Sequence, residues 1–128
     1  MGERTGIMEK AIKTFEDLLV WQKGIELSKE MYLLTKKPDF SKDFPLRDQI
    51  RRAVISIPTN IAEGYERASR KEYIHFLNIA KGSAGELRSL LRLALEIGYI
   101  DHATHENLRN RVLDLSRYLS NLIKSLRG

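Results

Sequence analysis

The chain has 128 residues, of which 42% are hydrophobic and 30% charged, as expected for one globular domain with a single core. It contains no cysteine, which excludes disulfide scaffolds, cysteine-ligated zinc and thiol catalysis. Residues 1–66 carry eleven basic and eleven acidic side chains, whereas residues 67–128 carry eleven and six, so the net charge of +5 lies in the second half. This asymmetry favours a polyanionic partner, although a charge of this size also serves solubility alone.

The sequence shows no membrane-spanning segment and no targeting segment. No apolar run approaches the roughly 18 to 20 residues that cross a bilayer, and residues 1–6 lack the apolar centre of a signal peptide. We therefore expect a cytoplasmic protein with no membrane association.

Apolar residues recur at three- and four-residue intervals and nowhere alternate for long, so the sequence predicts an all-α fold. We expect an N-terminal extension over residues 1–14 and one helical domain over residues 15–128. The first helix is predicted from about Asp17, as its N-cap, to about Lys36. Two adjacent apolar rows give it a wide buried face: Val20, Leu27, Met31 and Leu34, then Leu18, Trp21, Ile25 and Tyr32.

Three further helices are predicted after a connection over residues 37–45, which is the longest loop expected. They cover about 46–67, about 69–97 and about 104–126. Pro45 suits the start of the second helix, Ser69 and Glu72 have the spacing of a capping box, and Gly98 is a natural stop. The expected inward positions are Leu46, Ile50, Ala53, Val54, Ile57, Ile61 and Tyr65; Tyr73, Leu77, Ala80, Ala84, Leu87, Leu91 and Ala94; and Leu108, Val112, Leu115, Leu119 and Leu122. Four helices with mostly short connections favour an antiparallel up-down-up-down bundle.

Pro58 stands inside the second predicted helix. It lacks an N–H and collides with the Val54 carbonyl, so we expect a bend or a local opening at a cost of about 3 kcal/mol unless packing offsets it. The polar residues around it favour repair of the broken hydrogen bonding, by Asn60 or Ser56, over a small ligand pocket. Glu63 is expected to pair with Arg51, Arg52 or Arg67, within the chain or across a subunit boundary.

A basic stripe is the strongest functional signal. On the third predicted helix, residues at three- and four-residue steps share one side: Lys71, Asn78, Lys81, Gly85, Arg88 and Arg92. The fourth helix adds Arg117, Lys124 and Arg127. Two such stripes can follow the phosphate backbone of a nucleic acid, and this binding would depend on salt and not on base sequence. The alternative is a solvated surface, which is what most charge stripes are.

Two enzyme-like patterns are weaker. Glu72 and His75 have the Glu-x-x-His spacing of di-iron bundles, but those sites need a second such unit and two more glutamates. Gly82-Ser83-Ala84-Gly85 has the spacing of a phosphate-binding loop, but it lies mid-helix, where close approach of another helix explains it better. We expect neither a catalytic residue nor a metal or cofactor.

The order and spacing of several short segments over residues 15–100 resemble the four-helix bundle family of 23S rRNA intervening-sequence proteins. These segments are 15–18, 20–23, 49–53, 56–58, 60–64, 81–83, 86–87 and 98–100. The resemblance implies a left-handed up-down bundle that assembles as a homopentamer and has no known enzymatic activity. Members are often encoded within insertions in bacterial 23S rRNA genes. A related branch includes the accessory variability determinant of diversity-generating retroelements, which binds nucleic acid and a reverse transcriptase.

The sequence thus predicts a non-catalytic, oligomeric bundle that binds RNA or DNA through backbone electrostatics, with a nucleic-acid-processing protein such as a reverse transcriptase as a further partner. The alternative is an oligomeric protein-interaction scaffold with no nucleic-acid role. The candidate nucleic-acid-binding residues are Lys71, Lys81, Arg88, Arg92, Arg117, Lys124 and Arg127. The candidate structural or interface residues are Arg51, Arg52, Pro58, Asn60, Glu63 and Gly64.

Overall fold

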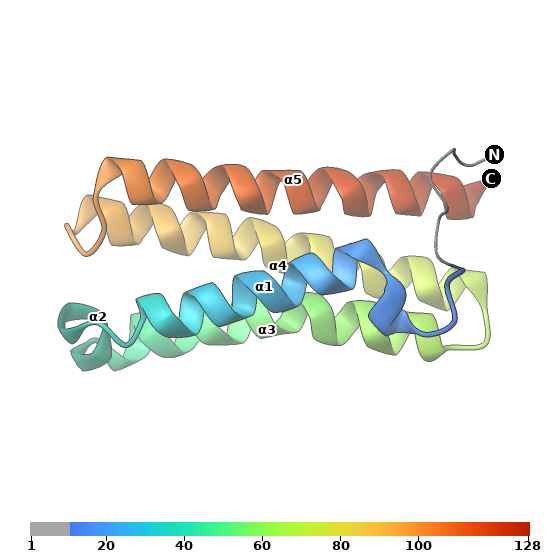
Figure 1. Ribbon diagram of the computed structural model, residues 1–128, viewed down its shortest axis with the longest axis horizontal. Helices are drawn as coiled ribbons and strands as arrows, with labels where there is room; N and C mark the ends of the chain where they lie inside the picture. Colours follow the sequence, from blue (N-terminus) through green and yellow to red (C-terminus); the bar gives the residue numbers. More distant parts are fainter. Residues whose placement is uncertain (1–10) are drawn as a thin grey trace.

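The computed structural model describes residues 11–128, so residues 1–10 of the predicted extension lie outside the described part. Within it, every regular element is helical, and the all-α prediction is confirmed. The elements are a 3-10 helix, η1 (Phe15–Asp17), and the α-helices α1 (Leu19–Leu34), α2 (Pro38–Lys42), α3 (Phe44–Glu66), α4 (Arg70–Glu96) and α5 (His102–Arg127). The four long helices lie side by side, and the short α2 lies at one end of the molecule (Figure 1).

The start of α1 differs from the prediction. Asp17 belongs to η1, and its carboxylate accepts hydrogen bonds from the backbone N–H groups of Lys13 and Thr14 at 2.9 and 3.1 Å. The Thr14 hydroxyl in turn accepts from the Glu16 backbone N–H. Asp17 is therefore not the N-cap of α1, because its side chain closes the preceding 3-10 turn instead.

The predicted loop over residues 37–45 contains a helix, α2, so this prediction was wrong. Pro38 occupies its first turn, where the missing N–H costs no hydrogen bond. Phe40 is fully buried, and its ring lies edge-on to that of Tyr99 with centroids 5.1 Å apart. A helical turn places this large ring inward, which explains why a proline-containing segment is ordered in this way.

The ends of the long helices are defined by local hydrogen bonds. Asp43, Ser69 and Asp101 each accept from the backbone N–H three residues ahead, at 3.2, 3.1 and 2.8 Å, and so cap α3, α4 and α5. The serine half of the predicted capping box is confirmed, whereas the Glu72 carboxylate contacts the Ser69 hydroxyl at 3.3 Å. Gly98 has φ +84°, as expected for the glycine that ends a helix.

The core follows the predicted seams of α3 and α4 closely. All the predicted inward positions of these two helices are buried except Tyr65 and Tyr73, which are half-buried. On α5, Ile123 is buried in place of the predicted Leu122, which packs against the core from its edge. On α1 the second row was wrong in part, because Ile25 and Tyr32 are 42% and 38% exposed.

Side-chain contacts show how α3 lies against its two neighbours. Gly24 of α1 packs on Pro58, where an added Cβ would lie 3.2 Å from the ring. Thr35, which caps the C-terminal end of α1, accepts a hydrogen bond from Arg51, which precedes Pro58 on α3. Towards α4, Gly64 approaches Phe76 and Ser56 contacts Ser83. Both neighbours therefore run opposite to α3, and α1 and α4 run in the same direction (Figure 1).

Candidate nucleic-acid interface

The basic residues predicted on α4 differ in how their charges are used. Lys71 and Lys81 are exposed, and within the described residues neither forms an ion pair. Arg92 is also exposed, but its Nε donates to Glu96 at 2.7 Å. Two of these three charges are thus available to an external anion without breaking a contact in the described part of the chain.

Arg88 is the most constrained cation of the set. Its side chain is half-buried and lies against Gly85, where an added Cβ would be 3.8 Å from Nη2. Among residues 11–128, its Nε is the one buried side-chain nitrogen or oxygen that lacks a hydrogen-bond partner. A buried donor without an acceptor costs about 1–3 kcal/mol, and a bound acceptor can recover this cost only after the Arg88 side chain moves to expose Nε.

The α5 residues are less uniform than predicted. Lys124 and Arg127 are exposed in the last turn of the helix. Arg117 is exposed but ion-pairs with Asp114, which lines a small depression with Lys23 and Leu27 of α1. The structure therefore turns Arg117 towards the α1 side and does not bring it to the flank of α4 that carries Lys81 and Arg88.

Sequence reasoning missed Arg109. This residue is exposed and lies two positions before Arg111, which turns towards α1 and pairs with Glu30 at 3.3 Å. Residues two apart point to opposite sides of a helix, so Arg109 lies on the side of α5 next to α4. Its position directly after Leu108, at the edge of the buried seam, is the signal that could have found it.

The polar groups around Pro58 are engaged in internal hydrogen bonds. Asn60 Nδ2 donates to the Ser56 carbonyl and hydroxyl at 2.8 and 2.9 Å, and the Ser56 hydroxyl lies 2.8 Å from that of Ser83. α3 continues as one helix through Pro58, so the expected local opening does not occur. Pro58 frees the Val54 carbonyl and not the Ser56 carbonyl, so the prediction that Asn60 or Ser56 repairs the broken hydrogen bond is wrong.

The Val54 carbonyl, which loses its helical partner to Pro58, is reached from another helix. The Ser28 hydroxyl of α1 donates to the Gly24 carbonyl at 2.8 Å and lies 3.4 Å from the Val54 carbonyl. Ser28 was not predicted in this role. It is possible only because Gly24 lets α1 approach the proline ring closely.

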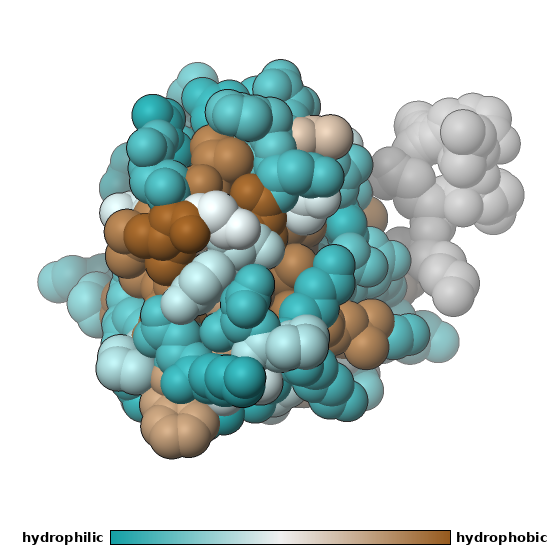
Figure 2. Space-filling model, turned by 90° about the vertical axis from the view of Figure 1, so that its left-hand side faces the viewer, coloured by the Kyte–Doolittle hydropathy of each residue, from teal (hydrophilic) through white to brown (hydrophobic). Residues whose placement is uncertain are grey.

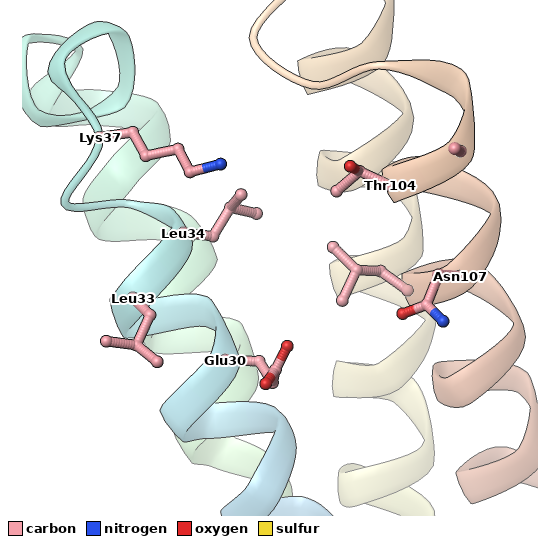
Figure 3. A pocket seen from close by; sticks show the side chains of 8 residues that line it. Glu30, Leu33, Leu34, Lys37, Thr104 and Asn107 are labelled. Atoms are coloured by element: carbon pink, nitrogen blue, oxygen red, sulfur yellow. The ribbon is translucent and has the colours of Figure 1, made fainter.

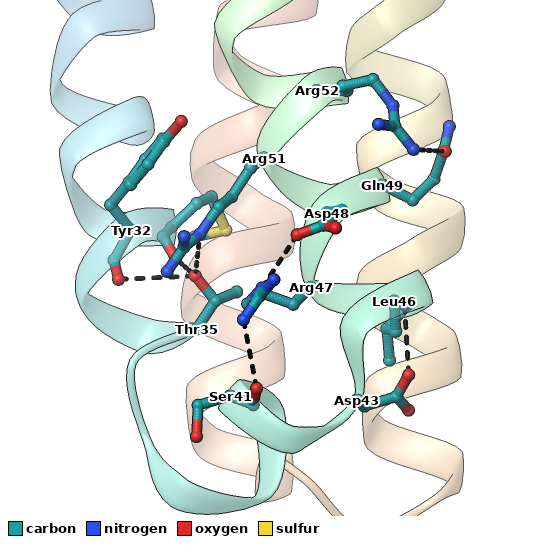
Figure 4. Close-up of polar contacts among 11 residues, drawn as sticks. Tyr32, Thr35, Ser41, Asp43, Leu46, Arg47, Asp48, Gln49, Arg51 and Arg52 are labelled. Carbon is teal, nitrogen blue, oxygen red and sulfur yellow. Dashed lines mark hydrogen bonds and ion pairs between the residues drawn. The ribbon is translucent and has the colours of Figure 1, made fainter.

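The remaining interface candidates contact neighbours within the chain (Figure 4). Arg51 Nε donates to the Thr35 hydroxyl at 2.9 Å, and its guanidinium lies over the Tyr32 ring, 4.6 Å from the centroid. Arg52 Nη2 donates to the Gln49 side chain at 3.0 Å. Of the partners proposed for Glu63, the structure selects Arg67, at 2.6 Å.

The same close-up shows an ion pair beside these residues. Arg47 donates to Asp48 at 2.8 Å and to the Ser41 carbonyl at 3.2 Å (Figure 4). The hydrogen bond from Arg47 lowers the pKa of the Asp48 carboxyl. The bond from Arg47 to the Ser41 carbonyl ties the start of α3 to α2.

The glycines of α4 are not explained by packing within the chain. An added Cβ at Gly82 would meet no atom within 4 Å, and one at Gly85 would meet only the Arg88 guanidinium. The predicted close approach of another helix is therefore wrong at Gly82 and Gly85 within residues 11–128. His75 is exposed beside Phe76, and no group of three or more metal-ligating side chains lies in the described part of the chain.

A cleft of about 440 Å³ lies between α1 and α5 near α2 (Figure 3). The side chains of Lys37 and Glu30 extend over it from the α1 side, and Thr104 and Asn107 face them from α5. Glu30 is already paired with Arg111 of α5 at 3.3 Å. In the described residues, no helix is long and apolar enough to cross a membrane.

These features define the chain as an all-helical protein with a basic helix flank. The sequence model of the family described as 23S rRNA-intervening sequence protein matches residues 16–121. The chain therefore belongs to this family.

Among solved structures, the chain is similar to a protein of unknown function from the S23 ribosomal protein family of Bacteroides thetaiotaomicron. The two are 30% identical, the match covers 83% of this chain and 96% of the other, and the TM-score is 0.77. No curated protein matches.

Proposed function

We propose that this chain is a non-catalytic, oligomeric protein that binds RNA or DNA through the sugar–phosphate backbone. The observation that carries the proposal is the state of the cations on α4: Lys71 and Lys81 are exposed without an ion pair in the described residues, and Arg88, which is half-buried, also forms no ion pair there. Phosphate oxygens are the acceptors that an arginine fork matches best.

The other basic residues extend this surface. Arg92 joins Lys81 and Arg88 at helical spacing, while Lys124 and Arg127 lie in the last turn of α5. Arg109 adds a cation on the α4 side of α5. Contacts of this kind fix position on the nucleic acid without reading bases, so binding should be salt-dependent and tolerant of sequence.

We further propose that the four long helices form a left-handed, antiparallel up-down-up-down bundle and that five copies assemble as a homopentamer in the cytoplasm. The family resemblance supports the pentamer, and exposed apolar side chains such as Phe44 and Leu93 support self-association. Repeating one basic flank around a ring would raise the affinity for a long polyanion through avidity.

A nucleic-acid-processing protein such as a reverse transcriptase is the second partner that we propose, on the basis of the family resemblance. The alternative function is an oligomeric protein-interaction scaffold with no nucleic-acid role. The apolar exposure of Phe44, Leu33 and Leu93 favours it, because such residues suit protein contacts better than phosphate contacts.

A binding titration separates the two functions. Fluorescence anisotropy of a labelled structured RNA and of a DNA duplex is measured with the wild type and with a variant carrying Lys81→Glu, Arg88→Glu and Arg92→Glu. We expect the variant to lose at least tenfold in affinity. The matched control carries Lys13→Glu, Lys37→Glu and Lys42→Glu, which change the net charge equally at exposed positions outside α4 and α5, and it should bind nearly as well as the wild type.

Equal losses in both triple variants would show that net charge alone matters and would refute the α4 surface. A wild type that binds neither RNA nor DNA would refute the nucleic-acid function and leave the scaffold function.

A further inference from the structure

α4 carries a second seam on its outer side. Five of its residues follow each other at alternating steps of three and four, which is the spacing of a helix-packing seam. They are Ile79, Gly82, Glu86, Ser89 and Leu93. We call these five residues the outer seam. Ile79 and Leu93 are 38% and 48% exposed, and no atom of the described residues outside α4 lies within 4 Å of the position that a Gly82 Cβ would take. A mid-helix glycine costs about 1 kcal/mol relative to alanine, so its presence at this point is explained best by a partner that approaches closely.

The outer seam leads into an apolar depression. Leu90, Leu93 and Ile97 of α4 line it together with Pro45, Leu46 and Gln49 of α3, and its volume is about 400 Å³. Apolar side chains reach the surface at this end of the molecule, surrounded by hydrophilic ones (Figure 2). The depression is large enough to receive an aromatic ring.

The chain carries a matching face on the other side of α3. Ile25, Lys29 and Tyr32 follow the same three- and four-residue spacing on α1. Phe44, at the start of α3, is 60% exposed and the most exposed large apolar side chain of the described residues. Arg51 covers Tyr32 and Arg47 covers Phe44, and these arginines are one helical turn apart, so both rings lie on one face of the α1–α3 pair. We call Ile25, Lys29, Tyr32 and Phe44 the ridge face.

The two surfaces lie at matching heights along the molecule. Gly24 is level with Pro58, and Ser56 is level with Ser83, which places Gly24 at the height of position 81 of α4. Since α1 and α4 run in the same direction, Ile25 is level with Gly82 and Lys29 with Glu86. Because α3 and α4 run in opposite directions, counting back along α3 from Ser56 to Phe44 corresponds to counting forward along α4 from Ser83 to position 95. Phe44 is therefore level with position 95, between Leu93 and Ile97 in the depression.

We propose that the ridge face of one copy packs on the outer seam of the next copy, with α1 parallel to α4 and no axial shift. Ile25 then covers Gly82, Phe44 enters the depression, and Lys29 opposes Glu86. Lys29 is exposed and has no ion pair in the described residues, and the Glu86 carboxylate, which accepts from Gln49, is exposed as well. The inference rests on the proposed self-association and names the surfaces that form it.

The contact is head-to-tail, because its two surfaces differ. Such contacts give either rings or open filaments. Here each surface lies on the side of its helix that is nearer to α3, because Tyr32 lies under Arg51 of α3 and Glu86 bonds to Gln49 of α3. Successive copies therefore turn towards their α3 sides, and the chain of contacts closes into a ring with α3 innermost.

A complementation experiment tests this pairing in the full chain. Phe44→Asp blocks the ridge face and Leu93→Asp blocks the outer seam, and light scattering coupled to size exclusion gives the mass of each species. We expect each variant alone to be monomeric, because every contact needs one surface of each kind. Mixed in equal amounts, they should form a 1:1 dimer and nothing larger, because one intact ridge face meets one intact seam.

The control is Leu33→Asp, at an exposed leucine of α1 that lines the cleft next to α5, which should assemble as the wild type does. Circular dichroism checks that each variant is folded. A charge exchange gives a second readout: Lys29→Glu and Glu86→Lys should each weaken assembly, and the double variant should restore it.

The outcomes separate this inference from the proposed function. A monomeric wild type would refute self-association and the interface together. An assembled wild type whose Phe44→Asp and Leu93→Asp variants stay assembled, or whose mixture forms no 1:1 dimer, would refute this interface and leave self-association standing.

Discussion

Gly64 is the position where a single added methyl group should disturb the α3–α4 packing most. An alanine there would place its Cβ 2.7 Å from Phe76 Cβ and 3.2 Å from both the Tyr73 ring and the Tyr73 carbonyl. Phe76 Cβ and the Tyr73 carbonyl are parts of α4 that cannot rotate away, so the two helices must separate by several tenths of an ångström. Overpacking of this kind costs about 1–3 kcal/mol.

Helix propensity acts in the opposite direction. Replacing a helical glycine by alanine gains about 1 kcal/mol in a helix interior and less at Gly64, which lies two residues before the end of α3. The net expectation for Gly64→Ala is a loss of about 1–2 kcal/mol in the free energy of unfolding. The matched variant Gly85→Ala meets only the Arg88 guanidinium at 3.8 Å, so it should gain up to about 1 kcal/mol.

Urea unfolding followed by circular dichroism measures both variants at equal protein concentration. The Gly64→Ala midpoint should fall and the Gly85→Ala midpoint should rise, with unchanged slopes. If Gly64→Ala were as stable as Gly85→Ala, α3 and α4 would not be in tight contact at Gly64, and the packing described here would be refuted.

Two further variants test local interactions. Burial, with a smaller contribution from Tyr65, raises the pKa of Tyr73 to about 12. In the unfolded chain the Tyr73 hydroxyl ionises near pH 10, so the wild type should lose stability between about pH 10 and 12. Tyr73→Phe should reduce this loss, as measured by urea midpoints across that pH range. An unchanged pH dependence in the variant would contradict the assignment to Tyr73. Asn60→Ala removes the donor to Ser56 and should cost about 1 kcal/mol by the same assay, whereas no loss would show that the Asn60–Ser56 bonds do not stabilise α3.

Much of the fold could be predicted because seams on α3 and α4 depend on local spacing alone. From Leu77 to Ala94, the inward apolar residues of α4 repeat at helical steps and so share one side of the helix. Any packing of such a helix buries that side. The second row of α1 could not be judged in this way, since burial of Ile25 and Tyr32 depends on whether a neighbour covers them. Within residues 11–128 none covers them fully, so the apolar pattern marks a surface.

The polar details depended on contacts that are distant in sequence. Ser28 reaches the Val54 carbonyl only because Gly24 of α1 packs on Pro58 of α3, and no local pattern pairs these segments. Arg88 was predicted as one member of a stripe, but its unpartnered Nε is a property of three-dimensional packing. Arg117 belonged to the same kind of pattern, yet Asp114 draws it to another side.

The salt dependence of nucleic-acid binding tests the central claim most directly. The affinity of the wild type for a DNA duplex is measured between about 50 and 200 mM salt, beside a variant carrying Lys81→Gln, Arg88→Gln and Arg92→Gln. Each phosphate contact contributes about −0.9 to the slope of log affinity against log salt, so the variant should be less steep by about 2–3. A salt-independent affinity, or the same slope in both proteins, would contradict phosphate binding by α4.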